Sequence, residues 1–446
     1  MRAHVRLLGL IGWLALPGIV ASGSGCGLLY KHAHTERRFT LYSNRSETYL
    51  KHVASKVERI YEGLGAVFKV PRERLGHPTI LLEGVDTDVV DFHYSPDILG
   101  CYIPFLNLIS IESTAAPRES ETTDPVLLHE IAHHFISTQW PAATSECWLN
   151  EGLAAALETS LFDADGFEFP LLNPELGQVA RHCARGKEPL LRLPDLLDMS
   201  WSQFHDREHR ERNYALAWAL VYYLLDRHLP ADMPLGEKID ALYRLDRGEI
   251  AGLEPKWIQF LRSFDLNGAL LTYARDTGSA TRRTARWAIE KLGQLRSGED
   301  LRLLEELAEL LDSPDFQVRV QAHVAFLRRL DQATHSYVLE HEVVHKGVAR
   351  VKRALRDSNE SRSVSLTIVD AAGECRRTQA DWVPCLVDLL DSTDGEVRAA
   401  AASALSRMSA KPTIVNPDFW REGTPNARGA EIAEWRAWLS TLNDQG

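Results

Sequence analysis

Two short segments carry residue types that chemistry needs: LLHEIAHHF at 127–135 and WLNEGLA at 148–154. The first places His129 and His133 four residues apart, with Glu130 directly after the first histidine. Residues four apart lie on one face of a helix, so both imidazoles can bind one metal ion. Glu130 is rotated by one residue and lies beside that ion, where a carboxylate can act as general base for water. The spacing predicts metal-assisted hydrolysis.

Two histidines leave a catalytic zinc site incomplete, because such a site has three protein ligands and one open position. The metzincin pattern requires a glycine and a further histidine after the motif. This chain has Ile136 and Gln139 at those positions, which excludes that class. Glu151 follows His133 at a distance that allows a helix end, a Trp-Pro turn and a returning helix. We expect Glu151 to be the third ligand.

The flanks of the motif predict the elements that must position it. Pro125 follows Thr122, Thr123 and Asp124, which can cap a helix start, and Trp140 precedes the proline that ends the run. The motif histidines therefore belong to a helix interior. From 125 to about 274 the pattern is predominantly helical.

Upstream of the motif, strands alternate with one helix. Residues 36–43 read as a strand, 48–68 as an amphipathic helix and 77–85 as a second strand. Gly100 then introduces 100–113, which we interpret as a broken strand pair. These segments predict an α+β class, in which a mixed sheet leads into the motif helix.

The phrase WLNEGLA is similar to the WLNEGFA of the aminopeptidase N-like branch of the gluzincin metallopeptidases. In that superfamily this glutamate is the third zinc ligand, which implies Zn²⁺ held by His129, His133 and Glu151, with Glu130 as general base. The resemblance also implies a tyrosine hydroxyl near the oxyanion. Tyr214 in RNYALAWALVYYLLD lies at a matching distance. A helix-face aromatic beside other aromatic residues is the alternative for this tyrosine.

The GAMEN-type phrase by which the aminopeptidases bind a free amine has no counterpart upstream of His129. The region 100–113 resembles instead the substrate-binding edge strand of gluzincin endopeptidases. The likeness is strongest over about 100–225, to peptidase MA-like domains of exported bacterial proteins. It implies a thermolysin-like catalytic domain, a mixed sheet plus a helical subdomain, over 36–275, and endopeptidase action on a protein or peptide.

The other polar residues near the motif have less specific readings. We expect His134 to be a packing residue or to lie behind the metal ligands. We expect His182, His205 and His209 to be surface residues. The alternative is that one of them donates an additional hydrogen bond to the oxyanion. Glu158 follows Glu151 on the same helix face, where it either hydrogen-bonds a ligand histidine or faces solvent.

From about 278 the chain becomes a series of short helices with a recurring phrase. LLDSPDFQVRVQAHVAFLRRL at 310–330 and LLDSTDGEVRAAAASALSRMS at 389–409 match closely, and 355–375 is a weaker middle copy. Asp312, Asp357 and Asp391 mark steps close to the helical-hairpin repeat length of roughly 40 residues. The phrase resembles HEAT-like repeats, which implies an all-α solenoid over 278–446. We expect a capping helix around Trp435, and an ordinary helical bundle remains the alternative.

The first 26 residues resemble an export signal. Arg2 and Arg6 precede an apolar run and then small residues ahead of Cys26. In a bacterial lipoprotein Cys26 would be lipidated and would be the membrane anchor, but Gly23 stands where a leucine is usual. Simple secretion is the other reading. We expect a location in the cell envelope or periplasm.

Composition narrows the remaining classes. The chain has 446 residues, 45% of them hydrophobic and 25% charged, which is ordinary globular material for two or three domains. A net charge of -12 without a basic stripe argues against nucleic acid as a partner. Among the six cysteines, Cys147 with Cys183 and Cys375 with Cys385 are candidate disulfides, although buried thiols are the plainer reading.

Three functions compete for this chain. The first is a zinc metallopeptidase whose repeats bind a protein partner or substrate. The second is a non-catalytic scaffold that uses the solenoid and carries a vestigial metal site. The third and weakest is a zinc hydrolase that acts on something other than a peptide, because a fold does not define a substrate.

Overall fold

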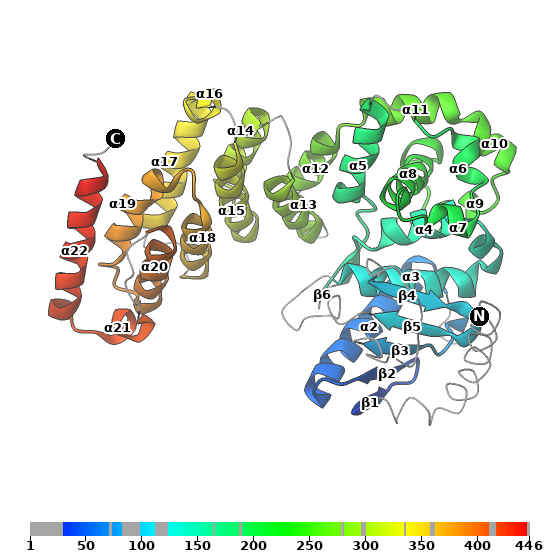
Figure 1. Cartoon of the computed structure of the whole chain (residues 1–446), viewed down its shortest axis with the longest axis horizontal. Coiled ribbons are helices and arrows are strands. Elements are labelled where there is room, and N and C mark those ends of the chain that lie inside the picture. Colours follow the sequence, from blue (N-terminus) through cyan, green and yellow to red (C-terminus); the bar gives the residue numbers. More distant parts are fainter. Residues whose placement is uncertain are drawn as a thin grey trace, which may run out of the picture. The chain divides into compact units, whose positions relative to one another are not determined.

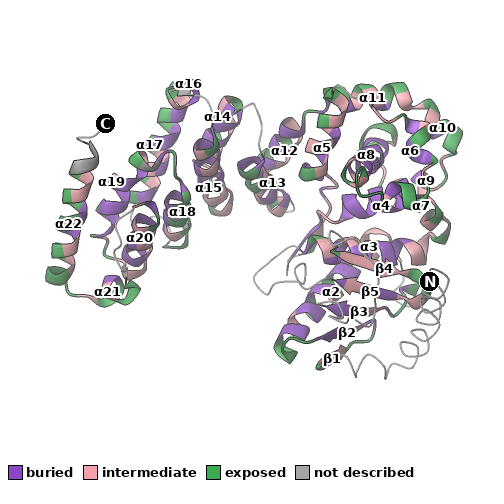
Figure 2. Cartoon of the chain, viewed as in Figure 1, coloured by how far each residue is buried: buried purple, intermediate pink, exposed green. Residues whose placement is uncertain are grey.

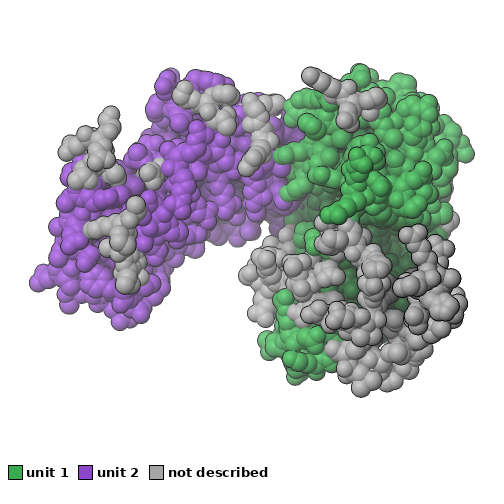
Figure 3. Space-filling view, viewed as in Figure 1, with its two compact units in different colours: residues 1–264 green, residues 265–446 purple. Residues whose placement is uncertain are grey.

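The chain divides into two compact units, Met1–Phe264 (unit 1) and Asp265–Gly446 (unit 2), which Figure 3 colours separately. A computed structural model describes residues 30–70, 74–82, 99–111, 124–163, 166–186, 190–276, 278, 281–295, 300–333, 336–356, 362–409 and 416–443. We predicted the first domain to extend to 275. Helix α12 (Leu266–Arg275) instead belongs to unit 2, because it packs against α13 (Arg282–Gln294).

A mixed five-stranded sheet supports the motif helix in unit 1, and its strand order is β1-β2-β3-β5-β4. The strands are β1 (His32–Thr35), β2 (Thr40–Ser43), β3 (Thr79–Leu82), β4 (Gly100–Ile103) and β5 (Leu108–Ile111). The inner pairs β2–β3 and β3–β5 are parallel, whereas the outer pairs β1–β2 and β4–β5 are antiparallel. Among the described strands, β4 is therefore an edge strand (Figure 1).

Two helices cover this sheet. Helix α2 (Glu47–Val67) packs against β1 and β2, and α3 (Pro125–Gln139) packs against β4 and β5. The side chains of Ile80 and Ile109 in the central strands have no exposed surface, as expected of parallel strands that are buried in a sheet. Lys56 of α2 donates to Asp124 at 2.8 Å, and both side chains are buried. This ion pair holds the start of the motif helix against α2.

The rest of unit 1 is helical apart from the hairpin of β6 (Leu161–Asp163) and β7 (Gly166–Glu168). The helices that follow α3 are α4 (Cys147–Leu157), α5 (Pro174–Arg185), α6 (Leu193–Leu197), α7 (Trp201–Phe204), α8 (Arg210–Tyr223), α9 (Leu235–Leu242), α10 (Arg247–Gly252) and α11 (Glu254–Ser263). Helix α8 is buried on all sides from Ala215 to Tyr223 and contacts α4, α5 and α11. It is the core helix of this half, purple in Figure 2.

A glycine allows α4 to lie directly on α8. A Cβ added to Gly152 would lie 2.5 Å from the carbonyl oxygen of Ala217, closer than real side chains come. Only glycine therefore permits this approach of the two backbones. The glycine of the WLNEGLA phrase thus fixes the distance between α4 and α8, and with it the position of the neighbouring Glu151.

Unit 2 is a row of helical hairpins. In addition to α12 and α13, its helices are α14 (Asp300–Leu310), α15 (Phe316–Gln332), α16 (Ser336–Leu339), α17 (Glu342–Arg356), α18 (Arg362–Glu374), α19 (Gln379–Leu389), α20 (Gly395–Met408), α21 (Pro417–Glu422) and α22 (Pro425–Asn443). Helices α13, α15, α18 and α20 contact one another in succession, and so do α14, α17, α19 and α22. Two parallel layers of helices result, as in an α-solenoid (Figure 1).

The two strong sequence copies share one local device. Asp315 and Asp394 each cap a helix, since one carboxylate oxygen accepts from the amides two and three residues later. In both copies the arginine of the Val-Arg pair, Arg319 or Arg398, reaches back and donates to the serine carbonyl that begins the turn. The repeated Asp, Ser and Arg residues therefore form a turn that is closed by side-chain hydrogen bonds.

The capping aspartates also join neighbouring hairpins. Arg282 at the start of α13 pairs with Asp315 at 2.6 Å, and Arg362 at the start of α18 pairs with Asp394 at 3.2 Å. The weak middle copy at 355–375 contains the end of α17 and all of α18, which pack together, and its Asp357 lies outside the described residues. Trp435 of the expected capping helix α22 is buried. This helix packs on α19 at the end of the row.

Other sequence expectations need correction or fall outside the described residues. Of the strand expected over 36–43, only 40–43 is a strand (β2), because the amide of Glu36 donates to the carbonyl of Phe39 and makes 36–39 the turn after β1. The candidate disulfides are not formed: Cys147, Cys375 and Cys385 are buried thiols. The proposed export signal and Cys26 lie outside the described residues. No described helix has the length and apolarity to span a membrane.

Candidate metal centre

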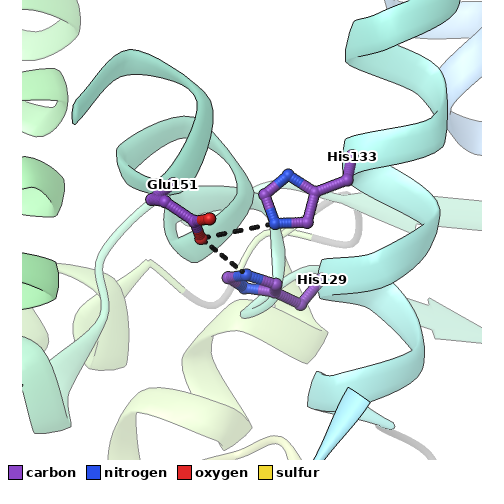
Figure 4. Close-up of side chains that lie close together, drawn as sticks. All are labelled: His129, His133 and Glu151. Carbon is purple, nitrogen blue, oxygen red and sulfur yellow. Dashed lines mark hydrogen bonds and ion pairs between the residues drawn. The ribbon is translucent and has the colours of Figure 1, made fainter. Parts of the chain in front are cut away.

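Three side chains from two adjacent helices converge on one point. His129 and His133 extend from successive turns of α3, with ring centroids 4.7 Å apart. The Oε2 atom of Glu151 on α4 lies 3.3 Å from the Nε2 atom of each imidazole (Figure 4). One ligand atom from each residue lies within 4.8 Å of the others. The structure therefore brings together the three residues that the sequence singled out.

These distances fit a tetrahedral ion better than direct hydrogen bonds. Two ligand atoms at roughly 2.0–2.1 Å from one zinc ion, separated by a tetrahedral angle, lie roughly 3.3 Å apart. The two Nε2–Oε2 distances of 3.3 Å equal that separation, and they are long for a charged N–H···O bond. The donor set of two imidazoles and one carboxylate is also a common zinc set.

Both imidazoles are oriented by hydrogen bonds at their Nδ1 atoms, on the side of each ring away from Glu151. The Nδ1 atom of His129 lies 2.8 Å from Glu158 Oε2, and Nδ1 of His133 lies 3.1 Å from Asn150 Oδ1. Because these oxygens accept, the neutral form of each imidazole carries its proton on Nδ1, and its Nε2 then has the lone pair that a metal needs. Of the two readings of Glu158, the structure shows the hydrogen bond to a ligand histidine.

Glu158 is itself held by a residue that sequence reasoning missed. Asn173 donates from Nδ2 to Glu158 Oε1 at 2.6 Å, and its Oδ1 caps α5. Its side chain is buried. No spacing rule links Asn173 to the motif, because β6 and β7 intervene. No role was predicted for Asn150 either, although its place in the WLNEGLA phrase next to Glu151 could have indicated one.

Charge and burial act in opposite directions on the three candidate ligands. Burial alone would lower the pKa of His129, but Glu151 and Glu158 outweigh it and raise that pKa well above its usual value. At Glu151 burial alone would raise the pKa, and the imidazoles of His133 and His129 hold it well below its usual value. Glu151 is therefore an ionised carboxylate, as a metal ligand has to be.

Glu130 lines one cleft together with the three candidate ligands but is outside the group of side chains that could hold an ion. Its side chain is 5% exposed, and its Oε2 atom is buried without a hydrogen-bond partner. Burial raises the pKa of this carboxyl group, and His133 and His129 partly oppose that shift. A Cβ on Gly100 would lie 2.9 Å from Glu130 Cγ, so β4 passes directly over the carboxylate. An unpartnered carboxylate oxygen in this position can accept a proton from water.

An open cleft of about 1160 Å³ gives access to these groups. Its lining includes Gly100 and Tyr102 of the edge strand, all three candidate ligands and Glu130. Tyr214 of α8 also lines it, and its ring centroid lies 6.2 Å from that of His129. Burial, and then the charge of Glu151, raise the pKa of the Tyr214 phenol well above its usual value. Tyr214 is therefore a protonated hydrogen-bond donor inside the cleft.

The four other histidines singled out from the sequence differ in burial and contacts. His205 lines the cleft, and its Nε2 lies 3.5 Å from Glu151 Oε1, so it is not a distant surface residue. His182 and His209 are exposed. His134 is a packing residue: its Nδ1 is 2.7 Å from the Tyr61 hydroxyl, and burial lowers its pKa to about 4.

Comparison with known proteins places only the C-terminal part of the chain. The HEAT repeat family model matches residues 383–411, which include most of α19 and all of α20. No curated protein and no solved structure matches the chain. Unit 2, with its stacked hairpins, thus contains a HEAT repeat. HEAT repeats usually mediate binding between proteins. The family match therefore concerns partner binding, and the candidate metal centre is argued from its geometry alone.

Proposed function

We propose that unit 1 is a zinc-dependent peptidase of the gluzincin type and that unit 2 binds a protein partner or substrate. The observation that carries the proposal is the convergence of His129, His133 and Glu151 beside a buried, unpartnered carboxylate oxygen of Glu130. Glu158 and Asn150 support it, because their hydrogen bonds leave both Nε2 atoms available to a metal. The thermolysin-like class is part of this proposal.

Each group then has a chemical task. His129, His133 and Glu151 would hold the zinc ion, which would supply a Lewis acid that lowers the pKa of water and polarises a carbonyl oxygen. Glu130 takes a proton from the attacking water and delivers it to the amine nitrogen that leaves. Tyr214 donates a hydrogen bond to the oxyanion that develops on the carbonyl oxygen. Water is thereby added across one peptide bond.

The edge strand supports a peptide as the substrate. Among the described strands β4 pairs with β5 alone, and all four of its residues are partly exposed. An extended peptide can add to such a strand through its main chain, as in β-strand addition. Because Gly100 passes over Glu130, a peptide bound along β4 would present its carbonyl groups near the base. We propose an endopeptidase on this ground.

A scaffold protein is the second candidate, and the HEAT match favours it more directly than it favours catalysis. In that reading the solenoid carries the function and the metal centre is vestigial. A zinc hydrolase that acts on another bond is a third candidate. Export, with or without a lipid anchor at Cys26, is proposed from the N-terminal sequence alone.

Metal content and cleavage measured together separate these candidates. We expect zinc-loaded protein to cleave unfolded casein, and Glu130→Gln to keep its zinc but to lose cleavage by roughly 10²–10⁴-fold, since the base is removed. His133→Ala should lose the zinc. Glu237→Gln is the control, because Glu237 is exposed and its ion pair with Lys69 is a surface one.

Two results would contradict the proposal in different ways. Full zinc occupancy in both Glu130→Gln and His133→Ala would mean that the ligands are assigned wrongly. Zinc-loaded protein that cleaves no unfolded substrate, while still capturing a protein through unit 2, would favour the scaffold.

A further inference from the structure

We propose that Trp201 and His205 form a subsite that accepts an aromatic or a large aliphatic side chain of an extended substrate. The inference rests on the proposed function, because it assigns a substrate class to the same cleft. Nothing in the motif indicated Trp201, which lies in the one-turn helix α7, outside the metal-binding segments.

Two exposed apolar side chains line the cleft. Five large hydrophobic side chains are exposed in the described parts of the chain, and they are Leu99, Phe105, Trp201, Phe316 and Tyr337. Of these, Leu99 and Trp201 line the cleft, while Phe105 lies in the 3-10 turn after the edge strand. Trp201 has 39% of its surface exposed. An indole left open to water at a binding cleft offers apolar area that a ligand can bury.

The indole is backed by a second ring. The imidazole of His205 stacks on it with a centroid separation of 5.3 Å and an angle of 11° between the planes. The next ring inward is Tyr214, 5.8 Å from His205. The stack therefore connects an exposed aromatic surface with the tyrosine beside the metal centre. A peptide whose backbone occupies the cleft can therefore place one of its side chains on Trp201.

The fold holds this stack in place. Ser200 and Gln203 form a capping box that fixes the single turn of α7. Asn213 of α8, which has no exposed surface, donates to the carbonyls of Gln203 and Phe204 at 3.3 and 3.0 Å. Phe204 is fully buried and packs on Tyr214. A preorganised surface of this kind loses little freedom when a ligand binds.

Charge does not single out another class of side chain. Arg210 and Glu211 line the same cleft with opposite signs. Glu158 and Glu151 are already engaged with the imidazoles. An apolar side chain against Trp201 is therefore favoured over a lysine or a glutamate, and peptides can test this directly.

The experiment compares peptides that differ at one position, with Phe, Leu, Ala, Lys or Glu there, scanned along the sequence. For the full-length, zinc-loaded protein we expect kcat/KM to favour Phe over Ala by roughly 10–100-fold at one position, the range of apolar pockets. Trp201→Ala should reduce that ratio below about threefold, mainly through KM, and Trp201→Phe should retain most of it. Phe316→Ala, an exposed aromatic in unit 2, should leave the ratio unchanged.

Binding without turnover separates this inference from the proposed function. Fluorescence anisotropy of the same labelled peptides on zinc-loaded Glu130→Gln should show the same preference for Phe, and adding Trp201→Ala should remove it. An unchanged preference in Trp201→Ala with full zinc occupancy would overturn the subsite, as would a preference for Lys or Glu at that position. Loss of cleavage alone, with the binding preference intact, would contradict the peptidase and leave the subsite supported.

Discussion

At the scale of single residues, Glu158 joins two parts of unit 1. One oxygen holds the Nδ1 atom of His129, and the other accepts from Asn173 at the start of α5. The imidazole is thereby fixed in the tautomer that leaves Nε2 for a metal. Since a carboxylate behind a ligand histidine also raises the basicity of that ligand, Glu158 should contribute to metal affinity without touching the ion.

Glu158→Gln tests this role. The amide keeps the size of the side chain but removes the charge, so we expect zinc affinity to fall by roughly 10–100-fold. Competition with a chromogenic chelator measures the affinity, and Glu237→Gln is the exposed control. Equal affinities for Glu158→Gln and the unsubstituted protein would mean that the hydrogen bond has no part in metal binding.

The sequence predicted which residues come together at the candidate centre, but it predicted little of what surrounds them. HExxH and WLNEGLA contain both histidines, Glu130 and Glu151. These residues were predictable because their spacing within a helix determines which face of the helix they occupy. Asn173 and Trp201 could not be found in that way. Each reaches the cleft through a tertiary contact between segments far apart in sequence, and no local periodicity records such a contact.

At the scale of elements, the separation of α4 from α8 determines where Glu151 lies. The two helices meet backbone to backbone at Gly152, and α8 is held in turn by α5 and α11. A wider separation would move Glu151 relative to α3. The geometry of the candidate metal centre therefore depends on the contact between Gly152 and α8.

Gly152→Ala should widen that contact. A methyl group 2.5 Å from the Ala217 carbonyl forces the helices apart, and overpacking of this kind lowers the free energy of unfolding by about 1–3 kcal/mol. We expect weaker zinc binding as well. Gly252→Ala is the matched control, because nothing lies within 4 Å of its added Cβ, and its unfolding should be nearly unchanged. Denaturant unfolding measures both variants, and equal midpoints would contradict the expectation.

Elements with a clear apolar pattern were predictable, whereas a polar strand and the packing partner of a helix were not. The helix expected at 48–68 is α2, and the broken strand pair is β4 and β5. Strand β1 was missed, since His-Ala-His-Thr has little β propensity and is stabilised by pairing with β2. Helix α12 was assigned to the first domain because its apolar spacing shows a helix but not the partner, α13, on which it packs.

At the scale of the whole molecule, the two compact units contain different features. All three candidate ligands lie in unit 1, and the HEAT match lies in unit 2. Ligand binding stabilises only the structure that holds the ligand. The response of each unit to metal therefore reports which part of the chain contains the site.

Calorimetry of the full chain should show this difference. With free zinc at about one hundred times its dissociation constant, unit 1 gains about 2.7 kcal/mol of stability relative to metal-free protein. We expect one unfolding transition to move to higher temperature with zinc and to return with EDTA, while a second transition stays in place. His133→Ala should abolish the shift, and movement of both transitions by equal amounts would contradict separate units.

The capping aspartates of unit 2 have a consequence for how this protein can change over evolution. Asp315 and Asp394 each close a turn inside one hairpin and pair with an arginine of the hairpin before it, so each clamp involves only nearest neighbours. Tandem duplication or deletion of a whole hairpin would regenerate the same junction. The row of helices in unit 2 can therefore gain or lose whole hairpins while the residues of the candidate metal centre stay as they are.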